Sequence, residues 1–142
     1  MKRQSCEDIA KKNYFGHALT LPPDDARLPK YHEQRNKRGF DDTELWSLDQ
    51  TIYRFTLPRL KRYKDILVGY PGCMSFLLEG EYKDFEPEKG NSERCGNLWE
   101  FLISEMIFGI EETTKENIKD SDRQRVENGI RLFHEYFNSL WV

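Results

Sequence analysis

The chain has 142 residues, of which 37% are hydrophobic, 33% charged and 13% aromatic, and its formal net charge is -3. A chain of this length is the usual size of one domain and can bury enough surface to fold without disulfides or a metal. The aromatic content excludes an intrinsically disordered chain, because such sequences are poor in aromatic residues. We therefore expect one folded domain over residues 1–142.

The cysteines and the hydropathy pattern restrict the setting. Cys6, Cys73 and Cys95 are odd in number, far apart and without C-x-x-C spacing, so we expect neither a disulfide framework nor a zinc site. No apolar segment follows residues 1–8, and no run of about 18 apolar residues occurs. The sequence predicts a cytoplasmic protein with no membrane partner, no metal and no cofactor.

The charge is unevenly distributed along the chain. Residues 1–70 carry 14 Lys and Arg against 10 Asp and Glu, whereas residues 71–142 carry 8 against 15. Such asymmetry favours self-association into a homo-oligomer or binding of a charged partner. The opposite charges can equally be paired within the fold when one half of the chain docks on the other. We favour the second explanation, since most charge imbalance on proteins is solvated surface.

Residues 1–40 have the weakest helical pattern. Five apolar residues predict one short amphipathic helix before Leu21-Pro22-Pro23: Ile9, Tyr14, Phe15, Ala18 and Leu19. Residues 1–29 are expected to form a loosely attached accessory segment. A basic stretch, residues 30–38, follows and ends at Gly39.

The first long helix is predicted to begin at Asp41. Asp41 and Glu44 have the spacing of a capping box, and Phe40 and Leu45 occupy the two positions of a hydrophobic staple. Two apolar rows follow at helical spacing, which predicts burial on more than one side. The first row is Leu45, Leu48, Ile52 and Phe55, and the second is Trp46, Tyr53, Leu57, Leu60 and Tyr63.

This helix is predicted to kink at Pro58 and to end before residues 69–72. Proline lacks an N–H and crowds the carbonyl four residues before it, so a kink or a break is expected near Leu57. The apolar spacing resumes as far as Leu67, which favours one kinked helix. Pro71 and Gly72 suit the two central positions of a type II turn.

Two further long helices are predicted after a mixed segment. Residues 73–96 alternate aromatic and acidic residues and predict a long loop or a short hairpin. A helix capped by Asn97 and Glu100 follows, and it is apolar nearly all round, which predicts a central position. The last helix is expected to begin at Ser121, with Gln124 as its capping partner. Its stripe runs to the last residues: Val126, Ile130, Phe133, Phe137, Leu140 and Trp141.

Two glycines lie inside these last two helices. Gly109 and Gly129 each cost about 1 kcal/mol relative to alanine in a helix interior. A close approach of the two helices explains both. Together the elements predict an all-α fold, a small bundle of three long helices with an N-terminal accessory segment.

Four blocks of the sequence carry a resemblance. Residues 38–42 read R-G-F-D-D, 46–49 read W-S-L-D, 58–61 read P-R-L-K and 132–141 read L-F-H-E-Y-F-N-S-L-W. In this order they resemble a family of small uncharacterised helical proteins encoded by bacteriophages and prophages. The resemblance covers residues 37–142 and implies a helical fold in a phage-infected host cytoplasm. It implies no activity, residues 1–29 match nothing in the family, and residues 73–96 are longer than its linker.

Asp49 is the most unusual polar residue. It lies between Leu48 and Ile52 on a face expected to be buried, and a buried carboxylate must be paired or neutral. A structural salt bridge is favoured over a catalytic role. The nearest partners in the sequence are Arg38, Arg59 and Arg62.

Two basic clusters, residues 30–38 and 59–64, lie near aromatic residues. Arginine binds phosphate through two hydrogen bonds and aromatic faces stack on bases, so these clusters are candidates for a nucleotide or nucleic-acid site. An acidic chain nevertheless binds duplex DNA poorly without a strong local patch. The candidate residues for a phosphate or partner are Arg38, Asp49, Arg59, Arg62, Trp46 and Tyr53.

Three functions remain open from the sequence. Hydrolase, P-loop and Rossmann signatures are absent, and His17, His32 and His134 are scattered, so no catalytic residue is assigned. We favour a phage-encoded, non-enzymatic accessory protein that binds a host factor or a nucleotide signal, with counter-defence as its setting. The alternatives are a nucleic-acid-binding protein that uses the two basic clusters, and an enzyme centred on Asp49 and an arginine.

Overall fold

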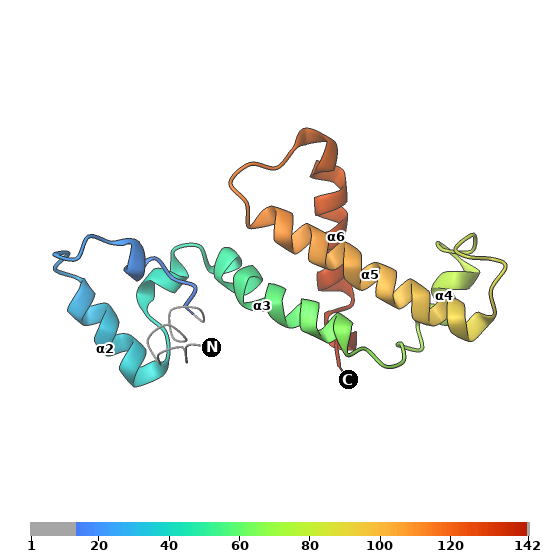
Figure 1. Ribbon diagram of the computed structural model, residues 1–142, viewed down its shortest axis with the longest axis horizontal. Helices are drawn as coiled ribbons and strands as arrows, with labels where there is room; N and C mark the ends of the chain where they lie inside the picture. Colours follow the sequence, from blue (N-terminus) through green and yellow to red (C-terminus); the bar gives the residue numbers. More distant parts are fainter. Residues whose placement is uncertain (1–13, 142) are drawn as a thin grey trace, which may run out of the picture. The chain divides into compact units, whose positions relative to one another are not determined.

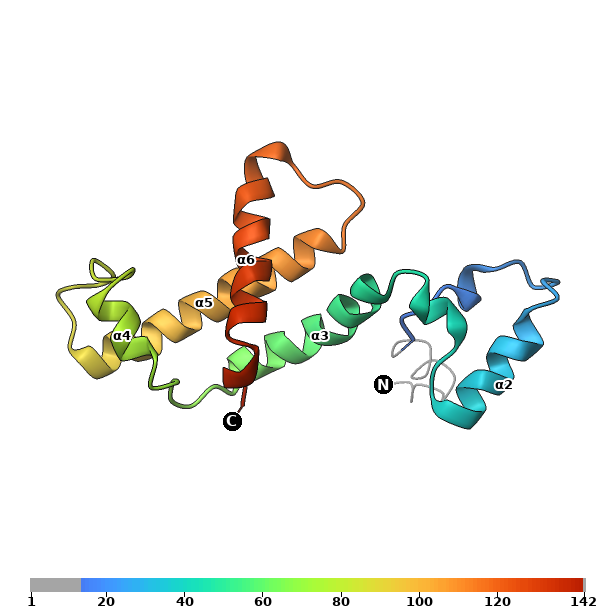
Figure 2. The ribbon, with the colours of Figure 1, turned by 180° about the vertical axis from the view of Figure 1, so that it is seen from behind.

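The computed structural model describes residues 14–141, and within this range all regular structure is helical (Figures 1 and 2). The all-α prediction is therefore confirmed. The α-helices are α2 (Leu28–Arg38), α3 (Leu48–Asp65), α4 (Met74–Glu79), α5 (Asn91–Thr113) and α6 (Arg123–Glu135). Short 3-10 helices are η1 (Ala18–Thr20), η2 (Asp42–Leu45), η3 (Asp120–Asp122) and η4 (Phe137–Ser139).

The chain divides into two compact units within α3. The first unit is Met1–Thr56 and the second is Leu57–Val142. A single domain over residues 1–142 stays a prediction.

Helix α5 supplies most of the core of the second unit. It carries seven apolar side chains with no exposed surface: Cys95, Leu98, Trp99, Leu102, Ile103, Met106 and Ile110. Helix α6 crosses α5 in both ribbon views, and its Leu132 and Phe133 are buried with them (Figures 1 and 2). Burial of each large apolar side chain contributes about 1.5–3 kcal/mol. The predicted central helix is thereby confirmed.

Two glycines allow α5 and α6 to cross closely. A Cβ on Gly129 would lie 2.2 Å from the carbonyl oxygen of Glu105, and a Cβ on Gly109 would lie 2.9 Å from the carbonyl oxygen of Val126. Both neighbours are backbone atoms, which cannot rotate away as a side chain can. The predicted role of the two glycines in helix packing is confirmed.

The prediction of a loop or hairpin over residues 73–96 is confirmed only for the turns at residues 80–90. Helix α4 lies in this range, and α5 begins at Asn91 rather than at Asn97. Arg94 explains the early start, because its guanidinium donates to the carbonyl oxygens of Phe85 and Lys83, each at 3.0 Å, and so binds the preceding turn to the first turns of α5. Sequence periodicity misses these turns because Cys95 is their only fully buried residue.

The expected start of the first long helix is half correct. The capping box of Asp41 and Glu44 is present, but it begins η2, and α3 begins only at Leu48. The Thr51 hydroxyl donates to the Glu44 carbonyl oxygen at 2.7 Å, and this bond links the first turn of α3 to η2. Helix α3 continues through Pro58 to Asp65.

The apolar row of the first helix is not buried as predicted. Leu45, Leu48, Ile52 and Phe55 are each about half exposed, and Leu60 is the buried residue of α3. Phe40 and Leu45, the expected staple pair, are exposed as well.

The last helix is shorter than predicted. α6 ends at Glu135, and Asp122 precedes it without a side-chain capping bond, so the expected cap of Ser121 and Gln124 is wrong. The buried part of the stripe is Val126 and Phe133, whereas Phe137 and Trp141 are exposed.

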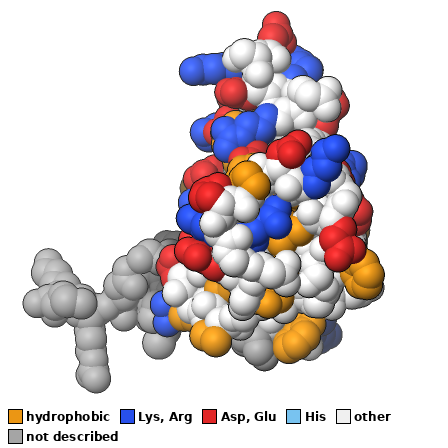
Figure 3. Space-filling view, turned by 90° about the vertical axis from the view of Figure 1, so that its right-hand side faces the viewer, with side chains coloured by type: hydrophobic (Ala, Val, Ile, Leu, Met, Phe, Trp, Pro, Cys, Tyr) orange, Lys and Arg blue, Asp and Glu red, His pale blue; other side chains and the backbone are white. Residues whose placement is uncertain are grey.

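Several apolar side chains of the second unit also reach its surface. Phe76 on α4 and Phe101 on α5 are exposed. In the space-filling view, hydrophobic side chains lie in separate places among Lys, Arg, Asp and Glu (Figure 3).

Candidate aromatic pocket

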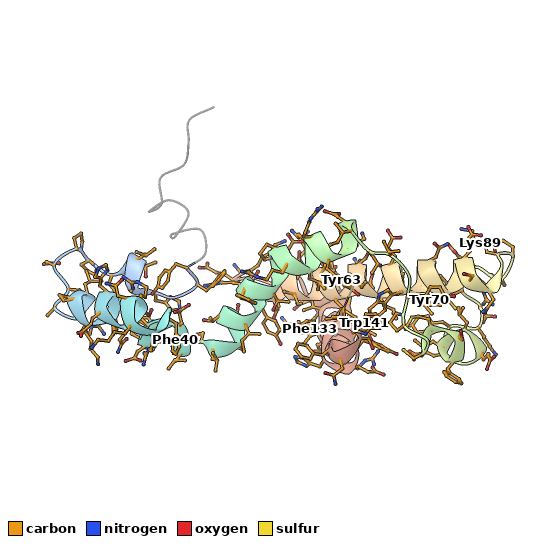
Figure 4. The ribbon with its side chains drawn as sticks, turned by 90° about the horizontal axis from the view of Figure 1, so that it is seen from below. Phe40, Tyr63, Tyr70, Lys89, Phe133 and Trp141 are labelled. Carbon is orange, nitrogen blue, oxygen red and sulfur yellow. The ribbon has the colours of Figure 1, made fainter. Side chains whose placement is uncertain are left out.

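The second unit has a small pocket at the end of α3, which we call the aromatic pocket. Its volume is about 200 Å³. Aromatic and apolar side chains line most of it, and three of them, Tyr63, Tyr70 and Trp141, are labelled in Figure 4. The full lining is Tyr63, Leu67, Val68, Gly69, Tyr70, Pro71, Trp99, Ser139 and Trp141.

The turn after α3 forms one side of this pocket. Gly69 has φ +84°, a left-handed conformation that glycine adopts without strain. Tyr70 and Pro71 follow, and the Tyr70 hydroxyl donates to the Ser92 hydroxyl on α5 at 3.4 Å. The predicted type II turn with a positive φ at Gly72 is not formed, because the positive φ lies at Gly69 instead.

Tyr63 and Trp141 close the other side. The Tyr63 hydroxyl donates to the Trp141 carbonyl oxygen at 3.1 Å, and the Trp141 amide donates to the Ser139 carbonyl oxygen at 3.1 Å. The first bond joins residues that are 78 apart in the sequence. The backbone of Trp141 is therefore held in place while its indole stays 70% exposed.

Trp99 forms the floor of the pocket. Its side chain is fully buried, and its ring meets that of Tyr136 edge to face with centroids 6.1 Å apart. Burial and the charge of Glu135 raise the pKa of Tyr136 to about 12. The floor is thus closely packed, whereas Val68 and Trp141 at the rim are open to solvent.

The chemistry of the lining suits binding. None of its nine residues carries a carboxylate, imidazole, thiol, ammonium or guanidinium group. Aromatic rings bury large areas and offer negative π faces, while the Tyr and Ser hydroxyls supply a few polar contacts.

The residues predicted from the sequence do not form this pocket. Trp46, Asp49 and Tyr53 belong to the first unit with Arg38, whereas Arg59 and Arg62 lie on the second-unit part of α3, where both are exposed. None of the six lines the pocket. They are therefore not brought together as one site within either unit.

Asp49 corrects the sequence interpretation most directly. It is exposed rather than buried. Its charge acts on Tyr53, one helical turn later. Burial first, and then the charge of Asp49, raise the pKa of the Tyr53 phenol. An exposed carboxylate needs no buried arginine partner, so the argument for a salt bridge with Arg38, Arg59 or Arg62 loses its premise.

Arg38 and Trp46 have structural neighbours in the first unit. Arg38 donates to the Asp42 carboxylate at 2.6 Å and to the Phe40 carbonyl oxygen at 3.2 Å. Trp46 stacks on His17 with centroids 5.8 Å apart and meets Tyr31 edge to face. Both residues hold this unit together.

A buried polar network centred on Asp41 organises the first unit. The Asp41 carboxylate accepts hydrogen bonds from the Tyr14 hydroxyl at 2.6 Å, from the Thr43 amide at 2.8 Å and from the Arg35 guanidinium. Burial raises the pKa of Asp41, but the bonds from Thr43, Tyr14 and Arg35 outweigh it and leave the pKa below its usual range. The sequence explains Asp41 by helix capping alone, and this does not predict its hydrogen bonds with Tyr14 and Arg35.

The pocket residues were missed because the sequence places them in apolar rows. Tyr63 and Trp141 fit apolar stripes at helical spacing, and such stripes predict core positions. The one local signal was Tyr70, an aromatic residue in a Gly-Tyr-Pro-Gly turn, where no helical stripe requires one.

The chain matches no protein-family model, no curated protein and no solved structure. Among residues 14–141, no group of three His, Cys, Asp or Glu is arranged to hold a metal ion. No helix in the same range has the length and apolar character needed to cross a membrane.

Proposed function

We propose that this protein is a phage-encoded, non-enzymatic accessory protein that binds a host protein and takes one side chain of that partner into the aromatic pocket. The pocket carries the proposal, because it combines a buried aromatic floor with an open aromatic rim. Aromatic pockets of this kind typically hold the central anchor of an interface. The phage setting comes from the sequence resemblance, and counter-defence is the role that would fit it.

The size of the pocket supports a side chain over a nucleotide signal. Ordinary small-molecule sites have volumes of about 300–1,000 Å³, whereas this pocket has about 200 Å³. A single side chain fits this space, but a base with its ribose and phosphates does not. No Lys or Arg lines the pocket to hold a phosphate.

Ion pairing argues against the nucleic-acid alternative. Every Lys and Arg of residues 30–38 has a carboxylate partner within 4.0 Å: Lys30 and Arg38 pair with Asp42, Arg35 pairs with Asp41, and Lys37 pairs with Glu33. In the second cluster, Lys61 pairs with Glu111 at 2.9 Å. A phosphate backbone would have to compete with these carboxylates for the paired cations.

The test is retention of a partner by pocket variants. Immobilised wild type, Trp141→Ala and Phe76→Ala are compared in lysate from infected bacteria, and any complex is reconstituted from purified partner. Phe76 is the matched control, because it is an exposed aromatic residue outside the pocket lining. We expect Trp141→Ala to weaken the reconstituted complex at least about tenfold and Phe76→Ala to bind as wild type. A complex indifferent to Trp141 would contradict the proposal.

A further inference from the structure

We infer that the side chain taken by the aromatic pocket is positively charged, a lysine or an arginine of the partner. This inference rests on the proposed function and specifies the chemistry of its partner. The observation behind it is that aromatic rings line one small pocket close to the end of α3, in a unit whose acidic residues outnumber its basic ones.

The aromatic lining favours a cation. Tyr63, Tyr70, Trp99 and Trp141 contribute rings to the lining. A cation within about 6 Å of a ring centroid is attracted by the negative face of the ring, and the attraction is larger where water is excluded. The exposed indole of Trp141 and the partly exposed ring of Tyr63 provide accessible faces, whereas Trp99 has no exposed surface.

The position of the pocket at the end of α3 adds to this preference. Leu67, Val68 and Gly69 line the pocket and lie two to four residues after the last residue of α3, Asp65. The carbonyl groups of a helix C-terminus carry partial negative charge and favour nearby cations. An anion would be repelled at the same place.

The charged residues nearest to Tyr63 in the sequence lie outside the pocket lining. Arg62 and Lys64 lie one residue before and after Tyr63, so on a helix they project about 100° to either side of it. Neither lines the pocket, and Arg62 is exposed. Residues 57–142 carry 16 Asp and Glu against 12 Lys and Arg, which favours approach of a basic partner.

Two small probes that differ only in charge test the inference. Nα-acetyl-arginine amide is titrated into the full-length protein alongside the citrulline analogue, which has nearly the same shape but no charge. The readout is the NMR shift of the indole N–H signals of Trp99 and Trp141, with Trp46 as an internal reference in the other unit. We expect saturable shifts with the arginine probe and binding at least about fivefold weaker for citrulline.

Two variants distinguish the contribution of the π face to arginine binding from the contribution of apolar contact. Trp141→Leu keeps an apolar side chain at the rim but removes the ring, so the preference for arginine over citrulline should fall to nearly none. Phe76→Leu makes the same change outside the pocket and should keep the preference.

The outcomes distinguish this inference from the proposed function. Equal binding of the two probes, or no binding of either, would overturn the cationic inference. Loss of the preference in Phe76→Leu as well would also overturn it. The proposed function is judged separately, by whether the reconstituted complex depends on Trp141.

Discussion

At the scale of single residues, Asp41 has the largest structural effect in the first unit. Its side chain is fully buried, and its partners come from three separated parts of the chain, Tyr14, Arg35 and Thr43. A buried carboxylate that lost these partners would be strongly unfavourable. The same aspartate also caps η2, so one side chain fixes both the start of η2 and the position of α2.

Replacement of Asp41 by asparagine should destabilise the protein substantially. The substitution leaves the Arg35 guanidinium without its buried counter-charge, which costs about 3–5 kcal/mol in typical proteins. Glu33→Gln is the control, since it removes an exposed surface pair with Lys37 at 2.7 Å, and it should change stability little. Urea unfolding of the three proteins gives the free energies, and similar values for both variants would contradict the role of Asp41.

The depressed pKa of Asp41 predicts acid sensitivity. Because the carboxyl group binds a proton less readily in the folded state, its stabilisation is complete above the ordinary pKa of about 3.9 and is lost as pH falls further. Burial raises the pKa of Glu44. The folded state therefore binds a proton at Glu44 more readily than the unfolded chain does, and this partly offsets the loss of stability at low pH. The difference in unfolding free energy between wild type and Asp41→Asn should shrink below about pH 4; a constant difference would refute it.

Tyr136 predicts a corresponding sensitivity to alkali. Burial and the charge of Glu135 raise its pKa from 10.0 to about 12, so the unfolded chain loses this proton first as pH rises. Its contribution to stability is complete below pH 10 and declines above it. Ultraviolet titration should show one phenol ionising near pH 12 that disappears in Tyr136→Phe, and an unchanged titration would count against the assignment.

At the scale of helices, sequence pattern predicts the elements that bury an apolar face and misses those held by polar contacts. Helix α5 and the glycines at its crossing with α6 were predicted because burial imposes periodicity. Helix α2 was not predicted, since Tyr31 is its one buried residue. It is held instead by Arg35 on Asp41 and by a double hydrogen bond between Gln34 and Asp42, and no sequence period marks such pairs.

Gly129→Ala tests the helix crossing. The added methyl group would meet the Glu105 carbonyl oxygen, and such overpacking costs about 1–3 kcal/mol, more than alanine gains in helix propensity. Gly96→Ala is the matched control inside α5, where the added group would have only an ordinary contact at 3.9 Å with Tyr70. We expect Gly129→Ala to lower the melting temperature and Gly96→Ala to maintain or raise it. If Gly129→Ala kept the melting temperature and Gly96→Ala lowered it, the two helices would not approach each other closely at Gly129.

At the scale of the whole molecule, the candidate site depends on contacts that sequence spacing does not encode. The aromatic pocket joins the end of α3, the middle of α5 and residues after η4. Each contributing residue is explained locally as core or turn, and only the fold brings Tyr63 to Trp141. The sequence identified basic clusters instead, because it shows where cations lie but not which carboxylates neutralise them.

Asp42 allows that neutralisation to be tested. Its carboxylate is 2.6 Å from the Arg38 guanidinium and 3.9 Å from the Lys30 ammonium group, so Asp42→Asn would free both cations and remove one negative charge. Wild type should elute from heparin or duplex DNA at low salt, whereas Asp42→Asn should be retained to higher salt, with the salt slope of binding steeper by about 1–2. Glu33→Gln is the control, because it frees only Lys37 and should have a smaller effect. Tight, salt-dependent binding by wild type itself would instead favour the nucleic-acid alternative, since the paired cations would then have exchanged their carboxylates for phosphates.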